Sequence, residues 1–168
     1  MYKIIDNFLD KDNYSKLSKY IKSEKVPWYF RNIDTTMGET KNKNGFFSFC
    51  FYNDHAPNHE SFYEFMPLFI RKLKIQSLIQ IRANLNFRDI DSRESAFHND
   101  YLYKNSLTGI FYLTNCNAKT VLDLSGVKKS VKSVENRMLL FSSKIKHNVK
   151  YQTDVHKRYL INFNFFGE

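Results

Sequence analysis

A histidine and an aspartate two positions apart form the part of this sequence best suited to metal chemistry. His98 and Asp100 occur in the segment Phe97-His98-Asn99-Asp100. In an extended chain, residues i and i+2 point to the same side, so both side chains can bind one cation. A third ligand can come from His147, 49 positions further on, if the intervening strands return beside the first pair. Two histidines and one carboxylate suit non-haem Fe(II) and oxygen chemistry, and Zn2+ also accepts this ligand set.

Arg158 adds an anion-binding group eleven positions after His147. A guanidinium binds a carboxylate through two parallel hydrogen bonds. Arg158 can therefore hold an acidic ligand at a set distance from the metal. Arg158, Leu160, Asn162 and Asn164 alternate with aromatic and aliphatic residues. If the apolar face packs against helices, the asparagine-lined face looks into a polar, ligand-binding cavity. The alternative is that Arg158 is a surface residue on an edge strand.

Three other histidines and two cysteines are interpreted as outside the chemistry. His55 and His59 have a spacing that suits a helical metal pair, but Pro57 between them favours a solvent loop. His156 lies in a polar turn and is expected to be exposed. Cys50 and Cys116 allow one disulfide at most and cannot form a four-thiolate metal site.

The elements that must position these residues are two helices and about eight strands. Asp10 or Asp12 is placed to cap a helix that runs to Ile21, and residues 60–74 are predicted to form a second helix. An aromatic-rich strand is predicted over residues 45–52. Further on, the pattern alternates with period two in seven short segments: 79–87, 108–114, 119–124, 127–134, 137–142, 145–151 and 158–166. This order predicts an α+β, mainly β, fold: a jelly-roll, or double-stranded β-helix, barrel with the N-terminal helices packed on one sheet.

The chain of 168 residues, 42% of them hydrophobic, is expected to form one domain. Residues 1–77 are interpreted as a helical support and residues 78–168 as the jelly-roll core. Residues 32–44 and 88–96 are polar and aperiodic, so they are expected to be mobile loops. We expect a cytoplasmic protein, because charge interrupts the first six residues and no run of eighteen apolar residues could span a membrane.

The net charge of +9 is concentrated late in the chain. Nine lysines and arginines lie in residues 128–158, against Glu135 and Asp154. A polyanion such as nucleic acid would suit this segment, but a charge run is more often a solvated face. The composition therefore leaves nucleic acid as a disfavoured partner and says nothing of oligomeric state.

These segments, in this order, resemble the 2-oxoglutarate- and Fe(II)-dependent dioxygenase superfamily, and in particular its prolyl-hydroxylase-like branch. The similarity covers most of the chain and includes residues 4–9, 81–85, 110–115 and 136–141. The resemblance implies an iron centre held by His98, Asp100 and His147, with 2-oxoglutarate and O2 as cosubstrates. It further implies that the distal carboxylate of 2-oxoglutarate binds Arg158 and Tyr112, and that asparagines line the cosubstrate pocket: Asn84 or Asn86, and Asn162.

The implied reaction is hydroxylation of an unactivated C–H bond, with release of succinate and CO2. A prolyl or other peptide side chain is the first substrate considered, and a small metabolite is the next. Asp100 is intact, whereas the halogenating members that resemble this pattern replace it with a small residue. Dioxygenases that repair nucleobases carry a second arginine where this chain has Asn164. Residues 117–120 also depart from the family, which often has Gly-Gly or Asp-Gly there.

Two alternatives remain open at this point. The first is a non-enzymatic jelly-roll binding module that uses the basic surface of residues 128–158. The second is a cupin-like metal enzyme that does not use 2-oxoglutarate and does not depend on Arg158.

Overall fold

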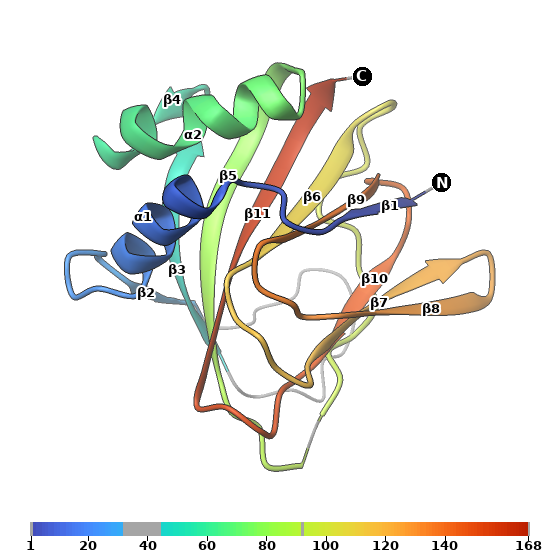
Figure 1. Ribbon diagram of the computed structural model, residues 1–168. Helices are drawn as coiled ribbons and strands as arrows, with labels where there is room; N and C mark the ends of the chain where they lie inside the picture. The colour runs from blue at the N-terminus through green and yellow to red at the C-terminus, as the bar shows by residue number, and fades with distance from the viewer. Residues whose placement is uncertain (1, 32–44, 92, 168) are drawn as a thin grey trace.

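The computed structural model describes residues 2–31, 45–91 and 93–167, so the loop expected at 32–44 lies outside the described residues. Two antiparallel sheets make up most of this part of the chain (Figure 1). The larger sheet has the strand order β1 (Tyr2–Ile5), β9 (Arg137–Ser142), β6 (Leu107–Tyr112), β11 (Lys157–Gly167), β5 (Ile75–Phe87), β3 (Phe46–Asn53) and β2 (Tyr29–Arg31), and β4 (Ala56–Pro57) pairs with β3. The smaller sheet has the order β10 (His147–Lys150), β7 (Lys119–Leu124) and β8 (Val127–Lys132).

Both predicted helices are present and lie on one side of the larger sheet (Figure 1). Helix α1 spans Lys11–Ile21 and begins at Asp10, whose side chain accepts a hydrogen bond of 3.0 Å from the backbone N–H of Asn13. Helix α2 spans Ser61–Lys72. It ends before the predicted limit because Lys74 adopts a positive φ of 49°, a left-handed conformation that stops a helix.

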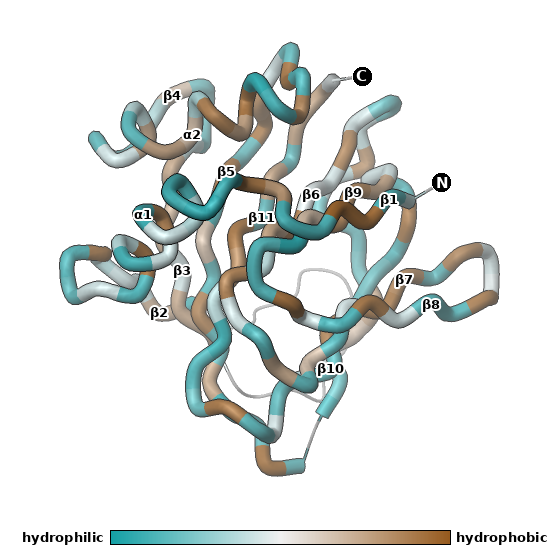
Figure 2. The backbone as a smooth tube through the Cα atoms, viewed as in Figure 1, coloured by the Kyte–Doolittle hydropathy of each residue, from teal (hydrophilic) through white to brown (hydrophobic). Residues whose placement is uncertain are grey.

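The main core lies between these helices and the larger sheet. From the last strand it receives the apolar residues expected there: Tyr159, Ile161, Phe163 and Phe165. Phe69 of α2 stacks on Phe163 with ring centroids 4.8 Å apart and meets Phe111 edge-on at 5.0 Å. Figure 2 shows hydrophobic and hydrophilic residues following one another along the strands. The period-two alternation therefore decides which face of β11 meets the helices.

The opposite face of the larger sheet looks toward the smaller sheet and forms the barrel interior. Part of that interior is apolar and is filled by Ile110, Tyr112, Leu122, Val131, Leu139, Phe141 and Leu160. The rest is polar and contains Asn84, Asn86, Arg158 and Asn164, all of them buried. The predicted jelly-roll fold with helices on one sheet is confirmed.

The observed strands differ from the predicted ranges in where they begin and end. Strands β6, β8 and β10 end one or two residues earlier than the alternating pattern suggested, because the chain leaves the ladder in turns. Strands β1, β2 and β3 come from the first 77 residues and hydrogen-bond within the larger sheet. The division at residue 78 into support and core stays a prediction. No described helix has the length and apolar character needed to cross a membrane.

Candidate functional site

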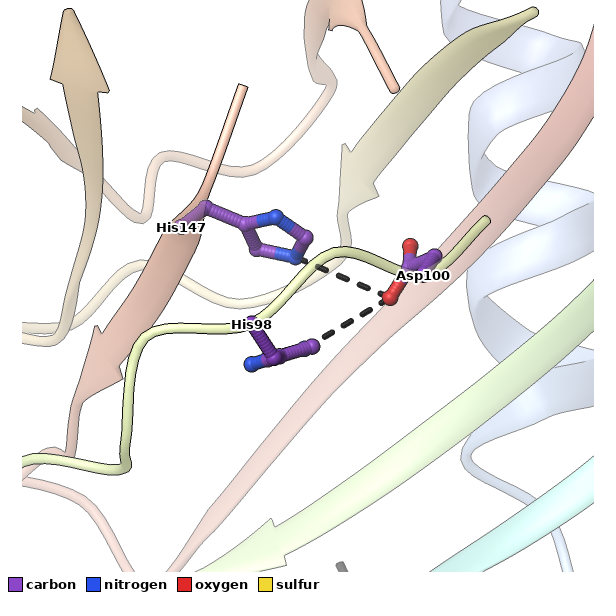
Figure 3. Close-up of side chains that lie close together, drawn as sticks. All are labelled: His98, Asp100 and His147. Atoms are coloured by element: carbon purple, nitrogen blue, oxygen red, sulfur yellow. Dashed lines mark ion pairs between the residues drawn. The ribbon is translucent and has the colours of Figure 1, made fainter. Parts of the chain in front are cut away.

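The side chains of His98, Asp100 and His147 meet at one point (Figure 3). One ligand atom from each lies within 4.8 Å of the other two. The Nε2 atoms of His98 and His147 lie 3.5 Å and 3.8 Å from the same carboxylate oxygen, Oδ1 of Asp100. Two imidazole nitrogens and a carboxylate oxygen facing a common point form a ligand set that suits a divalent transition metal.

A short backbone contact brings the two histidines together. His98 and His147 form an isolated antiparallel bridge, with N–H to carbonyl distances of 3.0 Å and 2.9 Å. His147 is the first residue of β10, whereas His98 lies in the irregular segment between β5 and β6. The His98–Asp100 pair was predicted to share one face of an extended segment. The two side chains do converge, although outside a regular strand, because the bridge to His147 holds this segment in place.

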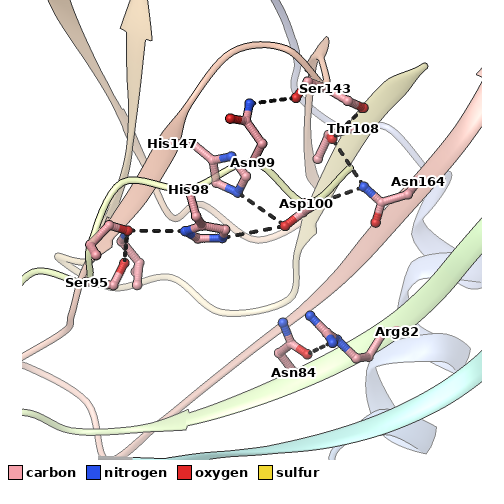
Figure 4. A network of polar contacts seen from close by, with 12 residues as sticks. Arg82, Asn84, Ser95, His98, Asn99, Asp100, Thr108, Ser143, His147 and Asn164 are labelled. Atoms are coloured by element: carbon pink, nitrogen blue, oxygen red, sulfur yellow. Dashed lines mark hydrogen bonds and ion pairs between the residues drawn. The ribbon is translucent and has the colours of Figure 1, made fainter. Parts of the chain in front are cut away.

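Asp100 is held by a partner that the sequence pattern did not assign. Nδ2 of Asn164 donates to Oδ2 of Asp100 at 3.2 Å, and it also lies 3.2 Å from Oγ1 of Thr108 (Figure 4). The Thr108 hydroxyl is in turn 3.0 Å from the hydroxyl of Ser143. Asn164 thus binds one carboxylate oxygen while the other faces the histidines. Its inward position was predictable from alternation along β11, but its partner was not.

Charge and burial act in opposite directions on these groups. Burial raises the pKa of Asp100, but the hydrogen bond from His98 and the nearby His147 lower that pKa well below its usual range. Burial lowers the pKa of His147. For His98, burial also lowers the pKa, yet Asp100 raises it more. Asp100 is therefore anionic and His147 favours its neutral form, which are the forms that bind a metal, whereas His98 must release its proton when a metal binds.

Arg158 is buried in the barrel, with 1% of its surface exposed. Its Nε donates to the Ser133 hydroxyl at 3.3 Å, and its guanidinium carbon lies 5.6 Å from the centroid of the Tyr112 ring. The terminal nitrogen Nη2 is buried without a hydrogen-bond partner. Among the described residues, no carboxylate forms an ion pair with it. The alternative of a surface Arg158 on an edge strand is wrong, because β11 lies between β6 and β5 and the Arg158 side chain is buried.

The other predicted cosubstrate residues line the same interior. Tyr112 is fully buried and donates its hydroxyl to Thr120 at 2.7 Å. Burial raises the pKa of Tyr112, and the charge of Arg158 acts against that rise. Asn84 accepts a hydrogen bond from Arg82, and Oδ1 of Asn162 is buried without a partner. Their roles toward a cosubstrate stay predictions.

The remaining histidines do not join a metal cluster within the described residues. His55 is exposed in a turn with a φ of 64°. Nδ1 of His59 lies 2.9 Å from the Ser61 hydroxyl at the start of α2. His156 is exposed, as predicted.

Comparison of the whole chain with known proteins gives matches in structure only. No protein-family model and no curated protein matches the sequence. The fold matches a prolyl hydroxylase from Trichoplax adhaerens, solved with a hypoxia inducible factor peptide fragment, at a TM-score of 0.72 and 15% identity over 99% of this chain and 83% of that one. It matches a 2OG-Fe(II) oxygenase family member from Burkholderia pseudomallei at 0.72 and 10% identity, over 98% and 84%. This chain has the 2-oxoglutarate/Fe(II) oxygenase fold.

A third structure with this oxygenase fold is the epimerase SnoN of nogalamycin biosynthesis, solved with Fe3+, α-ketoglutarate and nogalamycin RO. Its TM-score is 0.67 at 8% identity, over 99% of this chain and 78% of that chain. The likeness expected from the sequence segments is thus confirmed for the fold. At such low identity the chemistry must be argued from the side chains of this chain.

Proposed function

We propose that this protein is an Fe(II)- and 2-oxoglutarate-dependent dioxygenase that hydroxylates an unactivated C–H bond. One observation carries the proposal: a His-Asp-His cluster and a buried guanidinium without a counter-ion face the interior of one oxygenase-fold barrel. Strand β11 connects the metal cluster with the buried guanidinium, because Arg158 and Asn164 lie on the same face of this strand and Asn164 binds Asp100.

The metal cluster fits iron in its donor atoms and its charge. Two imidazoles and one carboxylate leave part of the coordination sphere for other ligands, as non-haem Fe(II) oxygenases require. The ionised form of Asp100 is already favoured before a metal binds, and Asn164 holds the carboxylate oxygen that does not face the histidines. When bound, iron and 2-oxoglutarate together activate O2 with release of succinate and CO2, while the protein positions and shields the reacting groups.

Arg158 fits a dicarboxylate cosubstrate. A buried charge without a partner costs several kcal/mol, and a carboxylate is the partner that a guanidinium binds best. Ser133 accepts from Nε, so the terminal nitrogens remain for the ligand. The Tyr112 hydroxyl, now bonded to Thr120, can rotate toward the same carboxylate. A metal enzyme without 2-oxoglutarate would have no use for this buried cation, so the cupin-like alternative is less well supported.

For the substrate, we propose a prolyl or other peptide side chain. The support is the fold shared with a prolyl hydroxylase solved with a peptide fragment. The epimerase SnoN has the same fold, so the likeness does not support hydroxylation. The support for hydroxylation is the intact metal ligand Asp100, which halogenating members replace with a small residue. A binding module remains the alternative of another class, since Lys128, Lys129 and Lys132 on β8 are exposed.

An anaerobic titration of metal-free protein with Fe(II) and then 2-oxoglutarate tests the proposal. We expect a visible charge-transfer band from the chelated 2-oxo acid, and its loss in His147→Ala. The exposed His156→Ala is the matched control and should keep the band. Absence of the band in folded, metal-loaded protein would contradict the proposal. Salt-sensitive binding of nucleic acid by that same protein would then favour the binding module.

A further inference from the structure

Arg31 and Arg82 lie on the barrel-facing side of the larger sheet, and each is hydrogen-bonded to one member of a single cross-strand pair. Nε of Arg31 donates to the Ser48 hydroxyl at 3.0 Å, and Nε of Arg82 donates to Oδ1 of Asn84 at 3.1 Å. Ser48 and Asn84 are direct partners of β3 and β5, so their side chains lie on the same face. Strands β2, β3 and β5 thus present two guanidinium groups to one space.

Electrostatic effects on neighbouring groups support this placement. Burial raises the pKa of Cys50, while the charges of Arg82 and then Arg31 act against that rise, so both cations lie near this thiol. Figure 4 shows Arg82 and Asn84 on the wall facing the metal cluster.

Among the residues that the structure describes, no carboxylate neutralises the guanidinium of Arg31 or that of Arg82. Each uses Nε for a neutral partner, and the Phe46 ring lies 5.6 Å from the guanidinium carbon of Arg82. Restrained in this way, the terminal nitrogens are prearranged for a ligand that accepts several hydrogen bonds.

This pair is distinct from the cosubstrate anchor. Arg158 pairs in register with Asn86 near the end of β5, whereas Arg82 pairs with Asn162. Arg31 lies two strands away from β5, on the edge strand β2, and is exposed. The barrel therefore offers one buried cation for the cosubstrate and two accessible cations on another part of its wall.

We propose that Arg31 and Arg82 bind an oxyanion of the substrate, so that the substrate is acidic and carries a carboxylate or a phosphate beside the reacting carbon. The inference rests on the proposed function, because it takes the metal cluster as the place of reaction. Arg82, on the wall that faces the metal cluster, sets the distance between this oxyanion and the metal, and Arg31 adds charge from the open edge of the sheet.

Binding of two peptide pools tests this inference without knowledge of the natural substrate. Both pools are fluorescein-labelled ten-residue peptides with a central proline; one has Asp or Glu at four flanking positions and the other has Asn or Gln there. Fluorescence anisotropy is read with protein loaded with Ni(II) and 2-oxoglutarate, so that Arg158 is occupied and no turnover occurs. We expect the acidic pool to bind at least about tenfold more tightly, since hydrogen bonds to charged groups are the stronger ones.

Variants with equal changes of charge show which arginines cause the preference for the acidic pool. Arg31→Gln and Arg82→Gln should each weaken binding of the acidic pool by about tenfold or more, while Arg82→Lys should recover part of it because it keeps charge but not the planar donor pair. Arg71→Gln, an equal charge change at an exposed position of α2, should leave binding unaltered. Equal affinity for both pools, no binding of the acidic pool, or a preference insensitive to both glutamine variants would each overturn the inference.

Competition by small anions identifies the oxyanion. Displacement of the acidic pool by N-acetylglutamate points to a carboxylate, and displacement by inorganic phosphate at lower concentration points to a phosphate; either supports the inference. The charge-transfer titration on the same preparation separates the two hypotheses. A band without preference for acidic peptides would leave the dioxygenase proposal standing and remove only the arginine site.

Discussion

The side-chain amide of Asn164 lies 3.2 Å from Oδ2 of Asp100, so the last strand of the barrel restrains the carboxylate whose other oxygen faces His98 and His147. The same amide is 3.2 Å from the Thr108 hydroxyl. Strand β6 thus helps β11 to hold Asp100, which lies in an irregular segment without a ladder of its own.

Asn164→Ala is expected to weaken Fe(II) binding by about ten- to a hundredfold, because groups that orient a metal ligand have effects of this size. Anaerobic equilibrium titration with Fe(II) measures the change. Asn58→Ala, at an exposed turn position, is the control and should bind as the wild type does. Unaltered affinity in Asn164→Ala would show that Asp100 needs no support from β11.

His98→Ala and Asp100→Ala should each abolish stoichiometric Fe(II) binding and succinate formation, because each removes one of the three side-chain donors that the described part of the chain brings together. Metal content after dialysis and succinate release from 2-oxoglutarate are the measurements. His55→Ala removes an exposed histidine and should change neither. Wild-type turnover in either cluster variant would remove the metal assignment.

Arg158→Met should separate stability from cosubstrate binding. Methionine fills a similar volume and relieves the cost of burying a cation without a counter-ion, and Ser133 keeps its hydrogen bond to the Thr114 carbonyl at 2.9 Å. We expect a Tm no lower than that of the wild type without ligand, and a 2-oxoglutarate requirement raised by about a hundredfold.

The thermal shift caused by 2-oxoglutarate gives a second measurement on the same variant. Ligand at about 100 times its Kd stabilises the native state by about 2.7 kcal/mol, and with a Kd raised about a hundredfold this gain should fall to about 0.4 kcal/mol in Arg158→Met. Arg137→Met, which breaks the ion pair with Asp6, is the control and should retain the ligand shift. An undiminished shift in Arg158→Met would place 2-oxoglutarate elsewhere.

Phe69→Ala should lower the free energy of unfolding by about 3–5 kcal/mol, the range for removing a large aromatic side chain from a core. Phe69 is 1% exposed and contacts Phe8, Phe111 and Phe163 at ring centroid distances of 5.7, 5.0 and 4.8 Å. Urea unfolding of metal-free protein measures the loss. Tyr63→Ala on the same helix, where 70% of the side chain is exposed, should change little. A similar effect in both variants would argue against α2 as part of the core.

Local sequence was sufficient for the features that depend on neighbouring residues. The start of α1 at Asp10, one of the two capping residues predicted, the alternation along β11 and the inward face of its asparagines follow from capping and from the two-residue period of a strand. The residue types and order also led to the three side chains that meet in Figure 3 and to an Arg158 placed inside the barrel.

Tertiary structure decided the contacts between segments far apart in the chain. The bridge between His98 and His147 and the bond between Asp100 and Asn164 join residues 49 and 64 positions apart. The placement of Arg31 and Arg82 on one face of the sheet depends on the registers of β2 against β3 and of β3 against β5. Asparagine and arginine carry no sequence mark of their partner, and strand order and register decide which of them meet. The sequence by itself therefore determined which chemical groups are present and which way they face, and the sheet topology determined which of them act together.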